Sequence, residues 1–519
     1  MNNQFDELTK SLAQSVTRRA ALKKFGANAW LSPLALRKIR PGLAIMMLTG
    51  LLVFPSRGQV PLGPPTEISF PNPLAGCNDG FTPPGNWTIQ DASETCVAVN
   101  PRNPRNVVAL WMGGLIQNII TAVSFNGGAT WQSIPLPITQ CAGGPYLLAG
   151  DPWLSFGANG DLYASALAGN ILSSTALSIP ICKSTDGGLH WSAPTIVAGT
   201  SGPDHPSITA DTTDAHFAYA VWDQSSGNRG ISVFSRTTDG GLTWEPARTL
   251  VLPPAQNGIQ FSQFLVLPNG TVVAIYMQYF SNVAKKPITQ TSLQIIRSTD
   301  HGQTWSAPIT AVTMTPLYLP PNCMCNFTMV IDPETGETVQ DPTNPSFAVD
   351  RGNGNLYAIW EDGRFSNFQY PDIAFSMSSD GGFTWSDPIR VNQTPLNIPP
   401  LNRQAFLPNI AVAGNGTIGV SYYDFRFNTP DPGLPTDRWL VQCQPSATNP
   451  ATNPASWSNE VRLTPQSFNM EACHAWGGLD RFFIGDYQGL AGTGSGFVAT
   501  FGDVDQNAVT SVFAARVGP

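Results

Sequence analysis

Two short segments of the chain combine acidic residues with an arginine at the same spacing. One reads Trp-Glu-Asp-Gly-Arg-Phe and the other Tyr-Asp-Phe-Arg-Phe, so Asp362 precedes Arg364, and Asp424 precedes Arg426, by two residues. A guanidinium presents a planar fork of N–H donors that can hold a carboxylate through two parallel hydrogen bonds. The segments therefore indicate either arginines that bind an acidic ligand or ion pairs that brace the fold.

The elements that carry these segments are indicated by an eight-residue pattern that occurs five times. Residues 378–385 read Ser-Ser-Asp-Gly-Gly-Phe-Thr-Trp. An Asp at the third place can accept a hydrogen bond from its own backbone two residues on, and Gly at the fifth place can take a positive φ. The closing Trp begins the next strand with a large apolar surface. The third-place and closing residues are Asn126, Asp186, Asp239, Asp300 and Asp380, with Trp131, Trp191, Trp244, Trp305 and Trp385.

This pattern resembles the Asp-box of the sialidase superfamily and of other Asp-box proteins. The resemblance implies a β-propeller in which each box joins the third and fourth strands of a blade. It also implies that the Asp and Trp residues of the boxes are structural. It does not by itself imply an enzyme.

Strand-like stretches recur before each box, at intervals of roughly 50–80 residues, as in repeat architectures. Before the box at 378, for example, lie residues 347–349, 356–360 and 372–377. Two later units lack a proper box, and the last one, residues 483–515, ends before its fourth strand. Residues 67–70 could supply that strand and join the two ends of the ring. We predict one all-β propeller of seven four-stranded blades, with six blades as the alternative.

Strand direction assigns loops to the two faces of such a propeller. Because strands alternate in direction within an antiparallel blade, the loops between second and third strands, and the connections between blades, open opposite the boxes. Several carboxylates and four arginines fall on that opposite face. They include Glu94, Asp151, Asp204, Glu361, Arg364, Arg403, Arg426 and Arg481.

Roles for these residues are implied by the family resemblance. Sialidases hold the carboxylate of their substrate with three arginines, which here would be Arg364, Arg426 and either Arg403 or Arg481. Sialidases also use a Tyr nucleophile paired with Glu, and an Asp as acid, because a neutral nucleophile avoids repulsion by the anionic sugar. Tyr487 would be that nucleophile, Asp151 or Asp204 the acid, and Glu361 the base beside the Tyr. The Phe-Arg-Ile-Pro segment of the family is absent.

Simpler roles exist for the same residues. The two Asp–Arg pairs would serve equally as structural ion pairs between blades. Tyr487 would serve as a core aromatic of an inner strand. His205, between Asp204 and a proline, would be a loop residue held by the backbone rather than a proton-transfer group.

Residues 1–58 differ from the rest of the chain. The stretch Thr-Arg-Arg-Ala-Ala-Leu-Lys at 17–23 looks like a twin-arginine export signal, and residues 43–54 form an apolar run of the length of a signal h-region. That run is shorter than the roughly 20 residues of a membrane span. We expect residues 1–58 to be an export leader and residues 59–519 to be the propeller, so that the protein is periplasmic, secreted or at the cell surface. An uncleaved leader would be its one membrane contact, and a basic cytoplasmic tail is the alternative.

The charge of the remainder argues against nucleic acid as a partner. Residues 1–58 hold 9 of the 27 basic and 2 of the 35 acidic side chains, which leaves 18 against 33 and a net charge of −15. Such a surface repels phosphate backbones. Eight cysteines in an exported chain favour disulfides, whose pairing the sequence leaves open. No spacing typical of a metal site occurs, and we expect no cofactor.

These observations favour an exported, sialidase-like propeller that acts on or binds a glycan, with a carboxylate-bearing saccharide as ligand. An exo-α-sialidase, a retaining glycoside hydrolase, is the specific form that the resemblance implies. A non-catalytic propeller that binds protein or polysaccharide is the alternative. A lyase for uronic-acid polysaccharides would also use arginines with Tyr or His.

Overall fold

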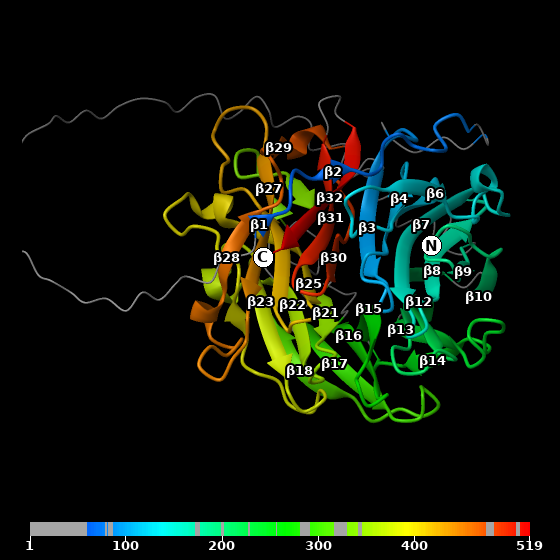
Figure 1. Ribbon diagram of the computed structural model, residues 1–519. Helices are drawn as coiled ribbons and strands as arrows, with labels where there is room; N and C mark the ends of the chain where they lie inside the picture. The colour runs from blue at the N-terminus through cyan, green and yellow to red at the C-terminus, as the bar shows by residue number, and fades with distance from the viewer. Residues whose placement is uncertain are drawn as a thin grey trace, which may run out of the picture. The chain divides into compact units, whose positions relative to one another are not determined.

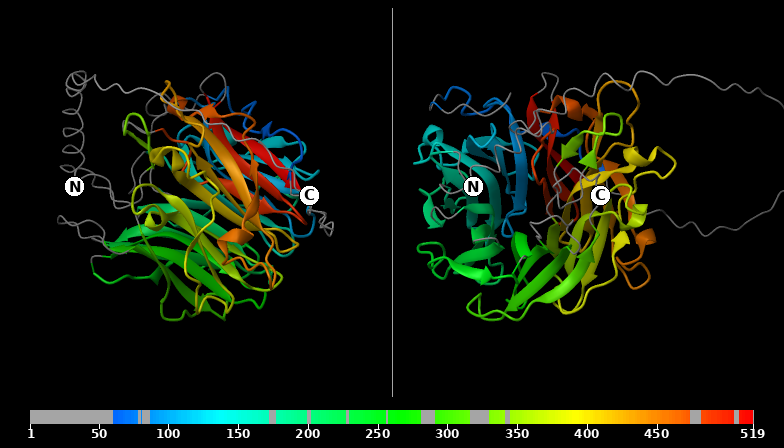
Figure 2. Two further views of the ribbon diagram at one scale, coloured as in Figure 1. Left: turned by 90° about the vertical axis from the view of Figure 1, so that its left-hand side faces the viewer. Right: turned by 180° about the vertical axis from the view of Figure 1, so that it is seen from behind.

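Seven antiparallel sheets follow one another along the chain and stand around a common axis in the computed structural model (Figure 1). The sheets remain distinct when the molecule is seen from two other sides (Figure 2). The structure describes residues 60–77, 80, 87–171, 177–198, 202–226, 229–255, 257–280, 291–315, 330–340, 345–473, 482–504 and 509–518. The predicted leader therefore lies outside the described residues.

Blades I to V each contain four strands in chain order. Blade I is β3 (Ala92–Val99), β4 (Val107–Gly113), β5 (Asn118–Ser124) and β6 (Gln132–Pro135). Blade II is β7 (Leu148–Phe156), β8 (Leu162–Gly169), β9 (Ile179–Ser184) and β10 (Thr195–Ala198). Blade III is β11 (Pro203–Ala210), β12 (Ala218–Ser226), β13 (Arg229–Thr237) and β14 (Arg248–Val251). Blade IV is β15 (Asn257–Val266), β16 (Val272–Phe280), β17 (Thr291–Ser298) and β18 (Ile309–Met314), and blade V is β21 (Ser346–Val349), β22 (Leu356–Asp362), β23 (Asp372–Ser378) and β24 (Ile389–Arg390).

Blades VI and VII complete the ring. Blade VI is β25 (Ala405–Val412), β26 (Ile418–Asp424), β27 (Pro435–Cys443) and β28 (Ser458–Arg462), and the short β29 (Phe468–Asn469) also pairs with β27. Blade VII is β30 (Gly489–Gly492), β31 (Phe497–Val504) and β32 (Thr510–Gly518), and its outer edge is β1 (Val60–Pro61) and β2 (Thr66–Glu67). The inner strands β3, β7, β11, β15, β21, β25 and β30 contact one another in turn, and β30 returns to β3.

Pairing between the two ends of the propeller closes the ring. Thr66 lies opposite Ala514, and Val60 lies opposite Gly518. This confirms seven blades and the predicted closure by the N-terminal strand, and it excludes the six-blade alternative. One strand prediction was wrong: the first strand of blade VII begins at Gly489, so Tyr487 lies in the segment that leads into it rather than on an inner strand.

The middle strands of the blades are apolar on both sides because each blade packs between two others. Every residue of β4 and of β5 is buried. Val108 and Leu110 of blade I, for example, share a core with Leu154 and Phe156 of blade II. Continuous runs such as Val-Val-Ala-Leu-Trp-Met therefore form middle strands, with no polar face for water.

The five boxes join third and fourth strands, as predicted, but their hydrogen bonds differ from the expected Asx-turn. In the box at 378–385, Oδ1 of Asp380 accepts the N–H groups of Phe383 and Thr384, three and four residues on. The hydroxyl of Ser378 accepts the N–H of Gly382 and donates to Asp380. Both glycines have a positive φ, 78° for Gly381 and 98° for Gly382.

The same hydrogen bonds hold the other boxes and set the charge of their carboxylates. In the blade III box, bonds from the hydroxyl and the backbone N–H of Thr243 lower the pKa of Asp239 to about 2. A carboxylate that stays ionised keeps its acceptor oxygens for the turn. The box carboxylates are therefore structural groups.

Each box also contacts the preceding blade. A Cβ at Gly188 would lie 3.0 Å from Val123 and 3.1 Å from Val108 of blade I, and a Cβ at Gly241 would lie 2.8 Å from Tyr163 of blade II. The box at 124–131 meets Arg516 of β32 in the same way. Glycine at the fifth place thus serves both the turn and the close approach of neighbouring blades.

A two-stranded hairpin and several short helices lie outside the blades. The hairpin of β19 (Val330–Ile331) and β20 (Thr338–Gln340) is joined to blade VI by hydrogen bonds between Gln404 and the backbone of Ile331. Short 3₁₀ helices also occur: η2 (Gln140–Ala142), η4 (Arg364–Ser366), η5 (Pro400–Arg403), η6 (Pro454–Ser456) and η7 (Met470–Ala472). In the described part of the chain, we find no helix with the length and apolarity to cross a membrane.

Replacing the fifth glycine of a box is expected to destabilise the propeller. Gly188 has a φ of 100° and lies against Val108 and Val123, so Gly188→Ala should lower the free energy of unfolding by about 1–3 kcal/mol. Urea unfolding followed by tryptophan fluorescence measures this. Gly494→Ala is the control, because a Cβ at Gly494 meets nothing within 4 Å and its φ is not positive. Equal losses in the two variants would contradict the proposed role of the box glycine.

Candidate functional site

Five of the seven inner strands contain a β-bulge near their first residues. Their pairing with the second strand shifts by one residue at this point, between Ser93 and Cys96 in β3 and between Gly150 and Trp153 in β7. The first bulged residue has a positive φ in all five: Glu94 (53°), Asp151 (49°), His205 (45°), Phe261 (60°) and Leu407 (51°). Because the inner strands start on the face opposite the boxes, the bulges ring the channel at that face.

Blades I to III place ionisable residues at the bulge, whereas blades IV and VI place apolar ones there. The N–H of His205 donates to Oδ2 of Asp151 at 3.3 Å, and Nδ1 of His205 lies 3.4 Å from Oδ2 of Asp204 and 3.9 Å from Oδ2 of Asp223. One oxygen of Glu94, Oε2, is buried without a hydrogen-bond partner among the described residues. The bulges thus bring several carboxyl groups and an imidazole together.

Tyr487 lies beside this group. Its hydroxyl donates to the carbonyl oxygen of Pro152 at 2.8 Å, and its ring meets that of Trp153 edge to face, with centroids 5.2 Å apart. A cavity of about 20 Å³, enough for about one ordered water, lies among these side chains. Its lining includes Asp151, Trp153, His205, Pro206, Ser207, Phe261, Ser262, Gln263 and Tyr487.

Burial and close charges shift the pKa values of this cluster. Burial raises the pKa of Asp151 to about 7, with a contribution from the charge of Asp204, and burial raises the pKa of Asp223 to about 7. Burial opposes a charge on His205, but the carboxylates of Asp204, Asp151 and Asp223 raise its pKa to about 9. Burial also raises the pKa of Tyr487 well above its usual range. At neutral pH the site therefore combines an imidazolium, a carboxyl group that can donate a proton, and a neutral phenol.

In two blades, a carboxylate on the second strand accepts a hydrogen bond from the bulge of the next blade. Oδ2 of Asp223 accepts the N–H of Phe261 at 2.6 Å, and Oε1 of Glu361 accepts the N–H of Leu407 at 2.9 Å. Glu361, the predicted base, thus lies between blades V and VI. The glutamate whose charge acts on Tyr487 is Glu94, and not Glu361.

The structure places Arg364 in an ion pair within its own loop. Its Nε donates to Oδ1 of Asp362 at 2.8 Å, and its Nη2 donates to Asp362 and to the carbonyl oxygen of Thr313. Asp362 is fully buried and also accepts the indole N–H of Trp360. These contacts join blade IV to blade V.

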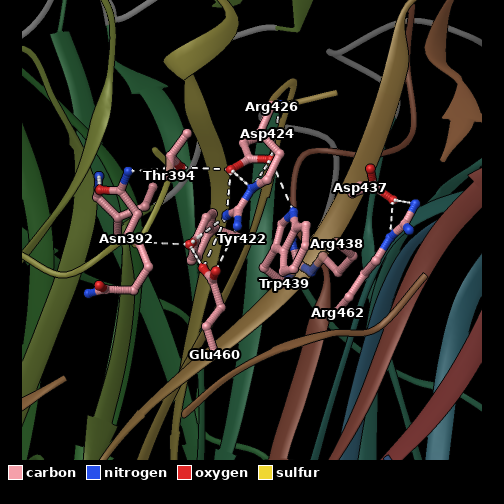
Figure 3. A network of polar contacts seen from close by, with 12 residues as sticks. Asn392, Thr394, Tyr422, Asp424, Arg426, Asp437, Arg438, Trp439, Glu460 and Arg462 are labelled. Atoms are coloured by element: carbon pink, nitrogen blue, oxygen red, sulfur yellow. Dashed lines mark hydrogen bonds and ion pairs between the residues drawn. The ribbon is translucent and has the colours of Figure 1, made fainter. Parts of the chain in front are cut away.

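Arg426 is bound more completely (Figure 3). Its Nε donates to Asp424 at 2.8 Å, its Nη1 donates to Glu460 at 2.7 Å, and its Nη2 donates to Glu460 and to the hydroxyl of Tyr422. The guanidinium lies over the ring of Trp439, 3.6 Å from its centroid. Only 7% of the Arg426 side chain is exposed. A ligand carboxylate would have to displace these partners.

Arg403 has partners different from those of Arg364 and Arg426. Arg403 donates from Nε to the carbonyl oxygen of Ile398 at 2.8 Å and from Nη1 to the hydroxyl of Tyr370 at 3.3 Å. Arg481 lies outside the described residues. The structure thus brings Asp151, Asp204 and Tyr487 together, while Arg364, Arg403 and Arg426 each have separate partners.

Comparisons with known proteins agree with this architecture. A family profile described as "BNR repeat-like domain" matches residues 154–315. A protein named "Sialidase" from Bacteroides fragilis (strain YCH46) is 26% identical over 213 residues, which cover 36% of this chain and 34% of the relative. The chain is an Asp-box β-propeller, and its residues 154–315 match this repeat family. The alignment spans only about a third of that relative's length.

Similarity to solved structures is found at low sequence identity. An α-L-arabinanase from Penicillium chrysogenum, complexed with arabinobiose, is 14% identical with a TM-score of 0.43, covering 70% of this chain and 93% of that one. A sialidase from Trypanosoma rangeli, in complex with sialic acid, is 12% identical with a TM-score of 0.40, covering 89% of this chain and 57% of that one.

The cysteines of this propeller include one disulfide in the described residues, between Cys77 and Cys141. Four further cysteines, Cys96, Cys182, Cys443 and Cys473, are buried thiols. Burial raises the pKa of Cys182 to about 12, so this thiol is protonated and unreactive at neutral pH. Cys323 and Cys325 lie outside the described residues.

Sequence reasoning missed the segment that packs against the first bulge. Gly485 has a φ of 103°, and a Cβ there would lie 2.3 Å from the backbone nitrogen of Glu94. Asp486, which follows it, contributes charge and a backbone hydrogen bond to Glu94. An Asp-Tyr pair after a glycine was the one signal in the sequence, and it does not reveal which strand the segment contacts.

The Arg426 network is expected to stabilise the fold in a way that lysine cannot reproduce. Lysine lacks the planar fork that serves Asp424 and Glu460 together, so Arg426→Lys should lower the free energy of unfolding by about 2–3 kcal/mol. Chemical unfolding measures the loss, with the exposed Arg102→Lys as the control. A variant as stable as the wild type would show that the network contributes no stability.

The stability of the propeller is expected to fall as pH rises from about 4 to 9. Asp151 and Asp223 have raised pKa values, so their contribution is present at low pH and is lost as pH rises through about 7. The contribution of His205 is present below its unfolded pKa and is lost as pH rises through about 9.

Asp151→Asn should flatten this profile between about pH 4 and 7, by a difference on the order of 2 kcal/mol across the range. Unfolding in urea at a series of pH values gives both curves. Asp387→Asn, at an exposed position, should leave the wild-type slope. Parallel profiles for wild type and Asp151→Asn would contradict the raised pKa.

Proposed function

We propose that this protein is an exported, sialidase-like propeller that cleaves a glycosidic bond at the bulge cluster. The main support is that Glu94, Asp151 and His205 occupy the same bulge position in blades I to III, where each has a positive φ. A positive φ costs a non-glycine residue on the order of 1–3 kcal/mol, and burying carboxyl groups close together adds to that cost. A requirement for stability alone favours glycine or the apolar residues of blades IV and VI.

The pKa values support distinct roles within this proposed site. Asp151, with a pKa of about 7, would protonate the leaving oxygen of the glycan below neutral pH. Tyr487, a neutral phenol close to Glu94, would leave its hydrogen bond to Pro152 and attack the anomeric carbon as the bond to the leaving oxygen breaks. Its phenolic proton would pass to the carboxylate of Glu94, and water would then release the sugar from Tyr487. His205 is the cation among the described residues that line the cavity, and it would attract the carboxylate of an acidic sugar.

A sialoside is the proposed first substrate, because a neutral nucleophile suits an anionic sugar. A non-catalytic glycan-binding propeller is the second candidate function. It is favoured by the occupied guanidinium groups of Arg364, Arg403 and Arg426 and by the small volume of the cavity. Export is part of the proposal, since the Cys77–Cys141 disulfide fits an oxidising compartment.

Hydrolysis of fluorogenic sialosides and arabinofuranosides by the purified protein tests the catalytic proposal. We expect release of the fluorophore from the sialoside, with kcat/KM falling as pH rises through about 7 as Asp151 ionises. Asp151→Asn should lower kcat by about 10²-fold or more, and Tyr487→Phe by a similar factor. Asp387→Asn should retain wild-type activity. Turnover of neither substrate, with retained binding of free sialic acid, would support the non-catalytic candidate instead.

A further inference from the structure

Blade VI, like blade VII, lacks a box, so no box covers blade V in the way that the box of the next blade covers each of blades I to IV. In each of blades I to IV, the box of the next blade covers one pair of residues that lie opposite each other on the second and third strands. These pairs are Val108 with Val123, Tyr163 with Lys183, Tyr219 with Arg236 and Val273 with Arg297. The contacts include Gly188 against Val108 and Val123, Gly241 against Tyr163, and the donation of Arg236 to the carbonyl oxygen of His301.

The corresponding pair in blade V is Tyr357 with Met377. The connection between β27 and β28 that should cover this pair is not a box but a longer loop, residues 444–457, which contains η6. A pocket of about 630 Å³ opens between blades V and VI, and both Tyr357 and Met377 line it. This volume lies within the roughly 300–1,000 Å³ typical of small-molecule sites. The pocket thus occupies the place of a missing structural turn.

Its walls come from three loops on the box face. The turn between β21 and β22 contributes Asp350 and Asn353, the turn between β25 and β26 contributes Asn415, and the long loop contributes Gln444. The carboxylate of Asp350 is oriented by hydrogen bonds from the N–H of Gly352 and from the side chain of Asn353. Each carboxylate oxygen keeps a further lone pair for a ligand.

The chemistry of these walls points to a neutral, polyhydroxylated ligand. The side-chain amides of Asn353, Asn415 and Gln444 each make hydrogen bonds within the loops. Each amide has a second N–H and a second lone pair, and the Asp350 carboxylate adds acceptors, which together match the hydroxyl groups of a sugar. The partly exposed thioether of Met377 offers a contact for its C–H face, and the ring of Tyr357 is buried beside it. The described lining contains no Lys, Arg or His, so an anionic sugar or a phosphate finds no cation there.

We propose that this pocket is a second saccharide-binding site, for a neutral sugar unit, on the face opposite the bulge cluster. It does not depend on catalysis at Asp151 and Tyr487. Its natural ligand would be a neutral glycosyl residue of a longer glycan or of a surface polysaccharide. Binding there would hold the protein on such a glycan whichever function the bulge cluster performs.

The test uses the purified full chain with maltose, cellobiose and lactose as neutral probes and N-acetylneuraminic acid as the anionic comparator. Saturation-transfer NMR detects binding, and calorimetry gives Kd. We expect at least one neutral disaccharide to bind the wild type. Asn353→Ala should weaken this binding at least fivefold, and Ser446→Trp, which puts a large ring at the rim of the pocket, should abolish it. Thermal melting of each variant checks that it is folded.

Two variants separate this site from the other features of the propeller. Asn159 is exposed and lies in the turn between the first and second strands of blade II, which corresponds to the turn of Asn353 in blade V. In blade II the box of blade III covers the pair of Tyr163 and Lys183. Asn159→Ala should therefore bind the disaccharide as the wild type does. Asp151→Asn alters the bulge cluster and should also leave this binding unchanged. The proposal is overturned if no neutral disaccharide binds, if Asn353→Ala and Ser446→Trp bind as well as the wild type, or if binding is lost in Asp151→Asn.

Discussion

The close approach of each box to the preceding blade is the contact on which the rest of the ring depends. Two consecutive residues of the turn take a positive φ, and the second lets the backbone touch side chains of the neighbouring sheet. A sheet alone buries one side only, so the blades are stable because each lies between two others. The box sets the spacing of the blades at one face and leaves the other face free for irregular backbone.

That other face carries a second repeated feature, the bulge at the start of the inner strands. A bulge redirects side chains toward the channel and leaves an N–H group that needs an acceptor. Carboxylates supply it: Asp151 for His205, Asp223 for Phe261 and Glu361 for Leu407. Because bulge and acceptor come from neighbouring blades, the acidic groups of the channel are linked to one another around part of the ring.

The sequence was sufficient to predict the boxes, their place between third and fourth strands, the seven blades and the closing strand. These follow from local turn chemistry and from strand periodicity, which act over a few residues. Contacts across blades were harder to predict. Loop parity put Arg364 and Arg426 on the bulge face, yet nothing local shows that Asp362, Asp424 and Glu460 occupy their guanidinium groups. The bulges could not be predicted from the sequence either, because Glu94, Asp151 and His205 share a backbone conformation but are three different residue types.

Closure of the ring by β1 and β2 against β32 has a consequence for synthesis of the chain. The edge formed by residues 60–67 leaves the ribosome before the strands of blade I, while its partner at 510–518 is made after the other strands of the ring. Until then this outer edge has no strand to pair with, and the first blade has no neighbour on one side. A chain shortened by a late stop codon would expose unpaired strand edges, which are sites of aggregation. Assembly of the circle therefore requires that residues 510–518 have been synthesised.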